Sequence, residues 1–418
     1  MASDWIRKLL GEWEGFEVID VEQKPVGGRQ PVPEIVLHLR ALPDHPKRCS
    51  QCGEPVSEVH DVTERRVRDL PILDHETWIV FPRARVRCPR CGTTVEAVPW
   101  LDKYQRMTKR LAEKIARLAM VLPVAHVASW FGVHWETVKQ LHRRALEAQL
   151  GPLTAESLRG VRLLVVDEFA IQKGHRYATV IVDAETKRVL WVARGRDRAA
   201  LRPFFDLLGT DGCASIEAVA MDMHAAYGEE VRANCPGAAI VYDLYHVVAK
   251  YGREVIDRVR VDEANRIARA DGPGPVREAR RVIKGARWLL LKNRTNITRA
   301  ESVRLDELLE ANESLFIVYV LKDDLKQIWR CSDPETAERF WHAWYRRALA
   351  SGVAPLVRFA KLLAPYVPGI IAHCRYPLHT GLVEGINNKI KVLKRMAYGY
   401  RDDAYFFLRI RAAFPGIP

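Results

Sequence analysis

The sequence predicts an α+β protein of several domains, and three observations lead to this prediction. The first hundred residues contain two Cys-x-x-Cys pairs among short apolar runs and Pro/Gly turns. The middle of the chain alternates apolar runs with amphipathic stretches, which is typical of strands and helices in succession. Residues 244–368 instead have the pattern of long, charged helices. We therefore expect a β-rich amino-terminal domain, a mixed core and an all-helical domain.

Composition restricts the class of partner. With 418 residues, 48% of them hydrophobic, the chain is long enough to build several cores. Its net charge of +13 attracts a polyanion such as nucleic acid, although a merely basic surface would give the same total. Residues 1–13 mix charged and apolar side chains, unlike a secretory signal, and no run approaches the roughly eighteen apolar residues of a membrane span. We expect no membrane partner.

Four of the cysteines are spaced in a way that predicts a metal site. Cys49 and Cys52 form one Cys-x-x-Cys pair and Cys88 and Cys91 form another, each followed by a glycine that lets backbone amides turn toward sulfur. Four thiolates satisfy tetrahedral Zn²⁺, whereas a redox site would need one such pair near the start of a helix. We therefore expect a zinc knuckle that stabilises a β-rich domain over residues 1–104.

Residues 105–150 predict a helix-turn-helix. Apolar residues recur at helical spacing over residues 108–122, 123–130 and 134–148, with a Gly-Val turn before the last of these helices. This order matches a DNA-reading helix-turn-helix, although a plain three-helix bundle would show the same apolar pattern. Basic charge and the neighbouring zinc knuckle favour DNA binding. The outward positions of the third helix, and thus the candidate DNA contacts, are Trp135, Lys139, Gln140 and Arg143.

The centre of the chain predicts a ribonuclease-H-like core. Strands are expected at residues 162–169, 175–183, 188–194, 216–222 and 238–243. Helices are expected between them at residues 198–208 and 225–233. Three antiparallel strands followed by alternating helices and strands is the order of this fold.

Two strand ends of this core carry candidate catalytic acids. Asp167 and Asp222 each end an apolar run, where burial of a carboxylate is costly unless a metal ion, a catalytic role or an ion pair compensates. Strand alternation is expected to turn Glu168 toward the opposite face of the sheet from Asp167, and Asp183 lies beside a turn. We therefore exclude Glu168 and Asp183 from the site.

The last predicted element is a helix over residues 380–398, which carries the third acid. On a helical wheel Glu384 shares its polar side with Asn388, Lys391 and Arg395, while apolar residues occupy the other side. Either this side is simply exposed to solvent, or Lys391 and Arg395 hold DNA against a carboxylate cluster.

A second basic stripe is expected on the helix that follows the Pro/Gly break at residues 271–275. Its members share one face, which either contacts DNA or is only solvated. They are Arg277, Arg280, Arg281 and Lys284.

Taken together, Asp167, Asp222 and Glu384 resemble the acidic triad of the DDE transposases. More narrowly, the chain resembles the IS-L-three family of bacterial insertion-sequence transposases over nearly all of its length. The motifs that carry this resemblance are Val166-Asp167-Glu168-Phe169 with Lys173-Gly174-His175, Met221-Asp222-Met223-His224-Ala225-Ala226-Tyr227, Asp243-Leu244-Tyr245-His246, Leu382-Val383-Glu384-Gly385-Ile386-Asn387-Asn388-Lys389-Ile390-Lys391 and Ala397-Tyr398-Gly399-Tyr400-Arg401.

The resemblance implies further properties. Asp243 and His246 would form an auxiliary motif near the active site. The ribonuclease-H-like core would comprise residues 160–246 and 370–418, interrupted by a helical insertion domain at residues 247–369. The protein would act on double-stranded DNA, both transposon ends and target, as a homodimer or higher oligomer in the bacterial cytoplasm, associated with the nucleoid.

The expected function is DNA transposition, that is, binding of the inverted-repeat ends followed by metal-dependent strand cleavage and strand transfer. Two Mg²⁺ ions held by the acidic triad can activate water or a 3′-hydroxyl and stabilise the leaving oxygen. Two alternatives stay open on the sequence alone. One is a ribonuclease-H-like nuclease or resolvase that cuts without joining, and the other is a catalytically silent, zinc-containing DNA-binding regulator.

Overall fold

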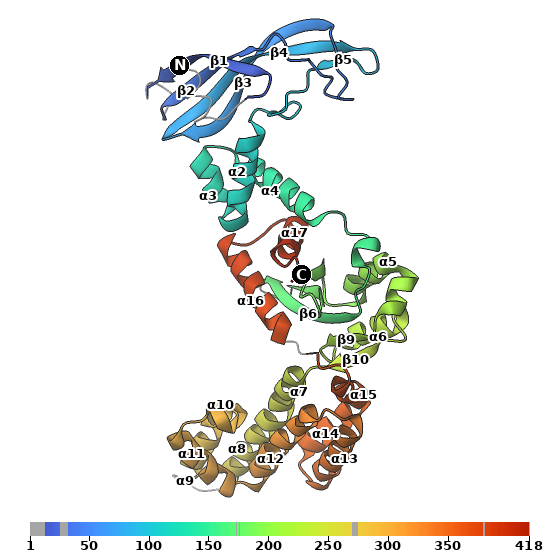
Figure 1. The fold of residues 1–418 in the computed structure, drawn as a ribbon. Coiled ribbons are helices and arrows are strands. Elements are labelled where there is room, and N and C mark those ends of the chain that lie inside the picture. Colours follow the sequence, from blue (N-terminus) through green and yellow to red (C-terminus); the bar gives the residue numbers. More distant parts are fainter. Residues whose placement is uncertain are drawn as a thin grey trace. The chain divides into compact units, whose positions relative to one another are not determined.

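The structure is a computed structural model that describes residues 13–25, 32–172, 174, 176–269, 275–378 and 381–417. Of Arg294, Leu382 and residues 275–279 only the backbone is described. The chain divides into two compact units, Met1–Gln149 and Leu150–Pro418 (Figure 1).

The first unit opens with a β-sheet. Its strands are β1 (Phe16–Lys24), β2 (Glu34–Ala41), β3 (Val59–Ile72), β4 (His75–Cys88) and β5 (Gly92–Val95). They lie in the order β1-β2-β4-β3, with β5 paired to β4; β2 runs parallel to β4 and the other pairs are antiparallel. Leu37, Ile79 and Phe81 are fully buried between the sheet and its loops. Because β3 and β4 have 14 residues each, the expectation of short strands is wrong for these two.

A buried carboxylate joins this sheet to the helices that follow. Asp69 on β3 has no exposed surface and accepts hydrogen bonds from Thr108 Oγ1 at 2.6 Å and Arg110 Nε at 2.7 Å. Thr108 is also the N-cap of the first helix, where its side chain accepts from the amide of Leu111. Because a buried carboxylate is tolerated only when it is paired, these contacts fix the start of the helix against β3.

The predicted helix-turn-helix is confirmed. Its helices are α2 (Lys109–Val121), α3 (Val124–Phe131) and α4 (Trp135–Leu150). They pack on one another through Leu111, Ile115 and Val138, which are all fully buried. Gly132 ends α3 with φ 57°, a left-handed conformation that glycine adopts without steric cost, and this turn redirects the chain into α4.

A five-stranded sheet forms the centre of the second unit. Its strands are β6 (Leu163–Gln172), β7 (Arg176–Asp183), β8 (Val189–Arg194), β9 (Ala218–Met221) and β10 (Ala239–Tyr242). They lie in the order β10-β9-β6-β7-β8, in which β6, β7 and β8 are antiparallel and β9 and β10 run parallel to β6. The five predicted strands are thereby confirmed.

Different helices cover the two faces of this sheet. They are α5 (Arg198–Ser215) and α6 (Ala225–Asn234) on one face, and α16 (Gly381–Met396) and α17 (Asp403–Ala413) on the other. Alternation along β6 supplies both cores: Leu164 and Val166 pack toward α5 and α6, whereas Val165 and Phe169 pack toward α16 and α17. Figure 1 shows α16 and α17 beside β6 although they come last in the chain.

Two sequence-based boundaries are wrong. The helix expected at residues 198–208 continues as α5 to Ser215, because the chain kinks at Gly209 (φ 73°) and then resumes a helix. The helix over residues 380–398 is not the last element, since α17 follows it and buries Phe406 and Ile410 against the sheet. Thr380 lies outside the described residues.

Between β10 and α16 the second unit is helical. The helices are α7 (Leu244–Tyr251), α8 (Asp257–Arg269), α9 (Pro275–Gly285), α10 (Arg287–Leu291), α11 (Arg299–Glu310), α12 (Glu313–Gln327), α13 (Pro334–Ala350), α14 (Ala354–Leu363) and α15 (Val367–Ile371). Trp341 and Trp344 stack in their core with ring centroids 5.4 Å apart. Of the Pro/Gly break expected at residues 271–275, residues 271–274 lie outside the described residues, and Pro275 begins α9.

One described stretch, Ala354–Cys374, is long and apolar enough to cross a membrane by length and composition alone. It is divided into α14, α15 and the short 3-10 turns Ala364–Tyr366 and Ala372–Cys374. Leu356, Phe359 and Ile370 from this stretch are fully buried in the core of the unit. A single such stretch is weak evidence and does not indicate a membrane protein.

Candidate functional site

Three acidic residues lie on or directly after adjacent parallel strands of the second unit: Asp167 within β6, Asp222 after β9 and Asp243 after β10. The register of β6 and β9, continued past their last paired residues, places Asp222 level with Asp167. The register of β9 and β10 likewise places Asp243 level with Asp222. Carboxyl ends of adjacent parallel strands form the edge at which α/β sheets bind ligands. The fold therefore gathers carboxylates that are far apart in the sequence.

A cavity of about 1140 Å³ opens at this edge. Asp167, Asp222 and Glu384 all line it, so the structure brings the three predicted catalytic acids to one site. One face of α16 forms a wall, and another wall comes from the helical segment between β10 and α16. The lining residues on these two walls include Gly381, Glu384, Asn387 and Lys391 on α16, and Lys326, Trp329 and Arg330 opposite.

Asp167 is held by a residue that the sequence analysis did not single out. Asn387 Nδ2 donates a hydrogen bond of 2.8 Å to Asp167 Oδ2. Burial raises the pKa of Asp167, and the nearby charge of Asp222 raises it further, while the positive field of His246 acts against this. Asp167 is thus a partly desolvated carboxylate whose ionised form needs a compensating cation.

Glu168, which the sequence analysis excluded from the site, also lines the cavity. It does face away from Asp167 across the sheet, and its Oε1 lies 3.9 Å from the guanidinium of Arg196. However, β9 pairs with β6 only as far as Val165, so the end of β6 projects past its neighbour and both of its faces reach the cavity. Burial raises the pKa of Glu168, as do the charges of Asp222 and Asp167.

Several buried polar atoms in or beside this site have no hydrogen-bond partner among the described residues. They are Asp222 Oδ1, Glu168 Oε2, Asn387 Oδ1 and His224 Nδ1. Buried polar atoms are normally paired, so a cluster of unpaired oxygens is what a site for a hard cation such as Mg²⁺ offers. The carboxylate oxygens of Asp167, Asp222 and Glu384 do not all lie within 4.8 Å of one another in the described chain.

Glu384 and the basic residues of α16 are open to solvent. Glu384, Lys391 and Arg395 are all exposed, and Lys391 lines the cavity. The helical wheel placed Asn388 beside Glu384, but the residue that turns into the site is Asn387; Asn388 is exposed and accepts from Lys391 Nζ at 3.3 Å. The polar side predicted by the wheel is thus exposed as expected, and the wheel did not show that Asn387 turns into the cavity.

Asp243 and His246 line the same cavity. Asp243 is the N-cap of α7, where its Oδ1 accepts from the amide of Tyr245 at 2.7 Å, and this places His246 in the first turn of the helix. Asp183, in contrast, accepts hydrogen bonds from Glu185 N and Thr186 Oγ1 in the turn after β7.

The four predicted zinc ligands converge in the first unit. One ligand atom from each of Cys49, Cys52, Cys88 and Cys91 lies within 4.8 Å of the other three. The cysteines are free thiols, and a backbone hydrogen bond at Cys52, partly offset by burial, lowers the pKa of Cys49 to about 6. Four sulfurs this close together are the donor set that Zn²⁺ takes in structural sites.

The outward face of α4 carries the predicted DNA contacts. Trp135, Gln140 and Arg143 are exposed, and Lys139 is half-buried. Lys139 lies 3.8 Å from Glu136 and 5.9 Å from the ring centroid of Trp135, and Arg143 bonds Glu147 at 3.0 Å. Exposed ion pairs of this kind contribute little to stability, so both cations can exchange a carboxylate for a phosphate.

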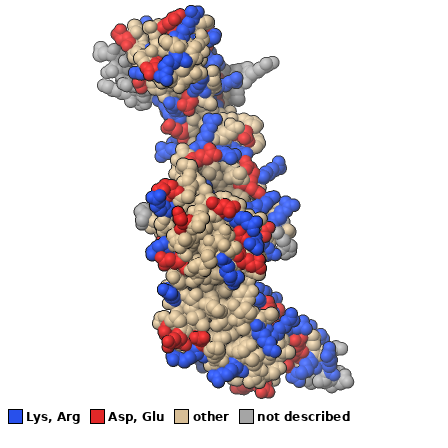
Figure 2. Space-filling model, turned by 90° about the vertical axis from the view of Figure 1, so that its right-hand side faces the viewer, with Lys and Arg blue, Asp and Glu red and all other residues tan. Residues whose placement is uncertain are grey.

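The basic stripe on α9 is partly described. Arg281 and Lys284 are exposed, and Arg280 is half-buried. The side chain of Arg277 lies outside the described residues. Figure 2 shows Lys and Arg gathered over the helical part of the second unit, at the lower right of the visible face. A basic surface of this kind suits a phosphate backbone.

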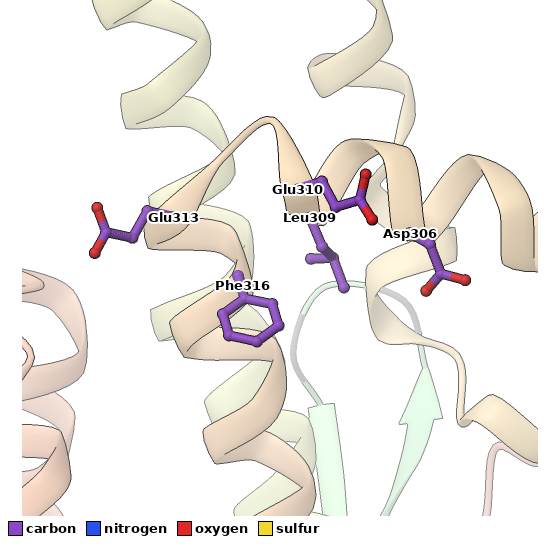
Figure 3. A pocket seen from close by; sticks show the side chains of 5 residues that line it. All are labelled: Asp306, Leu309, Glu310, Glu313 and Phe316. Carbon is purple, nitrogen blue, oxygen red and sulfur yellow. The ribbon is translucent and has the colours of Figure 1, made fainter.

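A smaller cavity of about 430 Å³ in the helical segment has a different character (Figure 3). Its lining residues are Asp306, Leu309, Glu310, Glu313 and Phe316. Figure 3 shows the three carboxylates arranged around the two apolar side chains. With no basic residue in its lining, this cavity would repel DNA phosphates, so we assign it no nucleic-acid contact.

Comparison with known proteins gives concordant matches over three regions. Residues 164–410 match a family of transposases, the DDE transposases of type ISL3. Residues 96–145 match the helix-turn-helix domain of transposase family ISL3, and residues 45–91 match the zinc finger of the transposases of IS204, IS1001, IS1096 and IS1165.

Two relatives match along almost their whole length. The transposase for insertion sequence element IS1001 of Bordetella parapertussis is 48% identical over 423 residues, which cover 100% of this chain and 99% of the relative. The transposase for insertion sequence element IS1557 of Mycobacterium tuberculosis is 30% identical over 419 residues, which cover 95% of this chain and 92% of the relative. The same match is found in two strains of that organism.

Proposed function

This chain belongs to the ISL3 family of insertion-sequence transposases and is a DDE transposase, and from that premise we propose that Asp167, Asp222 and Glu384 are its catalytic triad. The observation that carries this proposal is their meeting in one cavity. Asp167 lies within β6, Asp222 directly follows β9, the parallel neighbour of β6, and Glu384 comes from a helix that packs on the same sheet. An active site requires that its residues come together from distant parts of the sequence. Acids that are merely on the surface do not share one cavity in this way.

We further propose that the fold is a ribonuclease-H-like core with a helical insertion. The strand order β8-β7-β6-β9-β10, with the first three strands antiparallel and the last two parallel to β6, supports this assignment. The proposed core comprises residues 160–246 and 370–418, and the insertion residues 247–369. Before them come a zinc-binding β-rich domain at residues 1–104 and a helix-turn-helix domain at residues 105–150. Asn387 supports the return of the chain to the core, because it bonds Asp167 from beyond the insertion.

The residues at the cavity fit a pair of Mg²⁺ ions. Unpaired buried oxygens on Asp222 and Glu168, together with the desolvated carboxylate of Asp167, form an oxygen-rich site of the kind that Mg²⁺ prefers. Asp167, Asp222 and Glu384 would hold the ions. When bound, the ions supply a Lewis acid that activates the attacking oxygen and stabilises the leaving one.

The side chains of the protein perform the remaining tasks. Lys391, on the wall of the cavity beside Glu384, offers its ammonium to a phosphate adjacent to the scissile one. Lys326 and Arg330 belong to the helical segment between β10 and α16. They line another wall of the same cavity and add positive charge there. Asp243 and His246 form the auxiliary motif, in which the N-cap bond of Asp243 fixes the helix that carries His246.

DNA recognition is proposed to occur away from the cavity. The helix α4 would read the inverted-repeat ends through Trp135, Lys139, Gln140 and Arg143 in the major groove. The zinc site supports the β-sheet that in turn fixes α2 through Asp69. Arg280, Arg281, Lys284 and Arg395, with Arg277, would hold the phosphate backbone without reading its sequence.

Transposition joins two ends to a target, so we propose that the protein works as a homodimer or higher oligomer on double-stranded DNA, at the nucleoid in the bacterial cytoplasm. The decisive test is to incubate the full-length protein with Mg²⁺, duplexes carrying the ends of its element, and a plasmid target. Joined products are the expected result. Nicks without joining would identify a nuclease or resolvase instead, and bound but uncut DNA would identify a regulator.

A further inference from the structure

Asn387 occupies a position at the active site that neither the acidic triad nor the basic stripe explains. Only 9% of its surface is exposed, although it lies on a helix whose neighbouring polar residues are open to solvent. Its Nδ2 donates to Asp167 Oδ2 at 2.8 Å, and its Oδ1 is buried with no hydrogen-bond partner in the part of the chain that the structure describes. The residue lines the cavity. One side-chain amide therefore connects to a catalytic carboxylate and also offers an unpaired oxygen to the site.

We propose that Asn387 is a positioning residue for the metal site of this transposase. It fixes the orientation of Asp167 by occupying Oδ2, which leaves Oδ1 of Asp167 for a cation, and it presents its own Oδ1 as an acceptor in the cavity. The proposal rests on the function proposed for the triad, because it assigns to Asn387 the placement of one member of that triad. Partners that orient a ligand carboxylate in this way contribute strongly to metal affinity.

The chemistry of the contact requires an amide. Asparagine carries a donor and an acceptor on one short side chain, so it can satisfy a carboxylate and face a cation at the same time. Aspartate at this position would set a second negative charge against Asp167, and leucine would leave Asp167 Oδ2 buried without a donor.

The same contact also sets the position of Glu384. Residues three apart on a helix share a face, so Asn387 and Glu384 point into the cavity together. Two turns further along α16, Lys394 Nζ donates to the carbonyl oxygen of Ala170 on β6 at 3.3 Å. These two bonds tie α16 to β6 at both ends of the shared interface. The rotation of α16 about its axis, and with it the direction of Glu384, is thereby fixed.

The chain supplies a matched control in the next residue. Asn388 has the same chemistry in the same helix, but it is exposed and its contact is with Lys391. Alanine is a better helix former than asparagine, so neither Asn387→Ala nor Asn388→Ala weakens the helix itself.

The test measures metal binding without DNA. Full-length protein with its zinc site filled is titrated with MnCl₂, a stand-in for Mg²⁺, in a calorimeter. Asn387→Ala and Asn387→Leu are expected to weaken binding about tenfold or more, as the loss of a residue that orients a metal ligand typically does, and Asn388→Ala is expected to leave it unchanged. Equal affinities for wild type and both Asn387 variants would overturn the proposal. An equal loss of Mn²⁺ affinity in the Asn388→Ala variant would also overturn the proposal, because the loss would then not depend on the contact with Asp167.

A double-mutant cycle separates positioning from general disruption. Because Asn387 acts through Asp167, the losses caused by Asn387→Ala and Asp167→Asn should not add in the double variant. Additive losses would contradict the proposed route. The cycle also distinguishes this inference from the proposed function. If Asp167→Asn and Asp222→Asn bind Mn²⁺ as well as wild type, the triad assignment itself fails, whereas loss in those two with normal binding in Asn387→Ala removes only the role of Asn387.

Discussion

Asn387 donates a 2.8 Å hydrogen bond to Asp167 across a separation of 220 residues. This bond connects the strand at the centre of the sheet with the helix that comes after the nine α-helices described between β10 and α16. It therefore marks the place where the chain, after its long helical segment, returns to the sheet. The catalytic assignment of Glu384 depends on this return, because Glu384 lies one helical turn before Asn387.

Replacement of Glu384 by glutamine tests the third member of the triad. The variant keeps the shape of the side chain but loses the charge that would hold a metal ion. We expect normal folding and end binding, with strand cleavage and strand transfer both reduced by a factor on the order of a hundred or more. Cleavage and joining assays on end-containing duplexes measure this.

Glu313→Gln, in the separate acidic cavity of Figure 3, is the matched control and should retain full activity. If the Glu384 variant cleaves as fast as wild type, Glu384 is not part of the triad.

The raised pKa values of Asp167 and Glu168 predict an unusual dependence of stability on pH. Since burial raises both pKa values, the folded protein binds these protons more tightly than the unfolded chain. The free energy of unfolding without Mg²⁺ should therefore fall as pH rises from the ordinary carboxyl pKa of about 4 through the raised values. Asp167→Asn should flatten this slope and stabilise the Mg²⁺-free protein near neutral pH.

Urea unfolding of the zinc-loaded protein at several pH values measures the slope, with the exposed Asp206→Asn as the control. Added Mg²⁺ should stabilise wild type more than the Asp167 variant, because a ligand that binds only the folded state raises its stability. Identical pH profiles for wild type and Asp167→Asn would contradict the raised pKa of Asp167.

Replacement of Cys88 by serine tests the zinc site. The variant should lose one zinc ion per chain, and the loss of stability should be confined to the first unit, because the metal contributes folding energy where its ligands lie. Elemental analysis and limited proteolysis report the two effects. The control is Cys331→Ser, which changes a cysteine of the second unit that lies outside the four-cysteine cluster. This variant should keep the zinc ion of the first unit. Absence of zinc from the wild-type protein would refute the assignment.

Simultaneous replacement of Lys139 and Arg143 by alanine tests recognition by α4. Both side chains point outward, so the fold should be preserved while affinity for the transposon ends falls by about tenfold or more. Fluorescence anisotropy with labelled end and random duplexes gives the specificity ratio. The pair Lys114→Ala and Arg117→Ala on α2 is the control. A wild-type ratio in the α4 variant would show that another element reads the ends.

Replacement of Arg281 and Lys284 by alanine decides between the two interpretations of the basic stripe on α9. If these exposed residues hold phosphates, affinity should fall similarly for end and random duplexes, and the slope of log K against log salt should decrease by about two. Arg299→Ala with Arg304→Ala on α11 is the control. An unchanged salt slope would mean that the face is only solvated.

Short-range sequence patterns were sufficient to predict the zinc ligands and most of the helices and strands discussed above. The zinc ligands Cys49, Cys52, Cys88 and Cys91 were identified from spacing and ligand type, because a knuckle is built from a few neighbouring residues. The helix-turn-helix and the five strands of the second unit followed from apolar periodicity, since each element buries one face or both. The helix α17 was missed because its side chains do not form a single apolar stripe: Arg409 is buried in it beside Tyr400.

The tertiary structure decided which residues around the acids face the cavity. Strand alternation turns Glu168 away from Asp167, yet both line the cavity because β9 stops short of the end of β6. On α16, residues 387 and 388 lie three and four positions after Glu384, so both fall near it on a helical wheel. The packing of Ile386 and Ile390 in the core of the sheet, together with the bonds of Asn387 and Lys394 to β6, fixes the rotation of the helix and buries Asn387 instead of Asn388. Periodicity in the sequence shows which residues share a face of a helix. The direction in which that face points depends on the elements from the rest of the chain that pack against the helix.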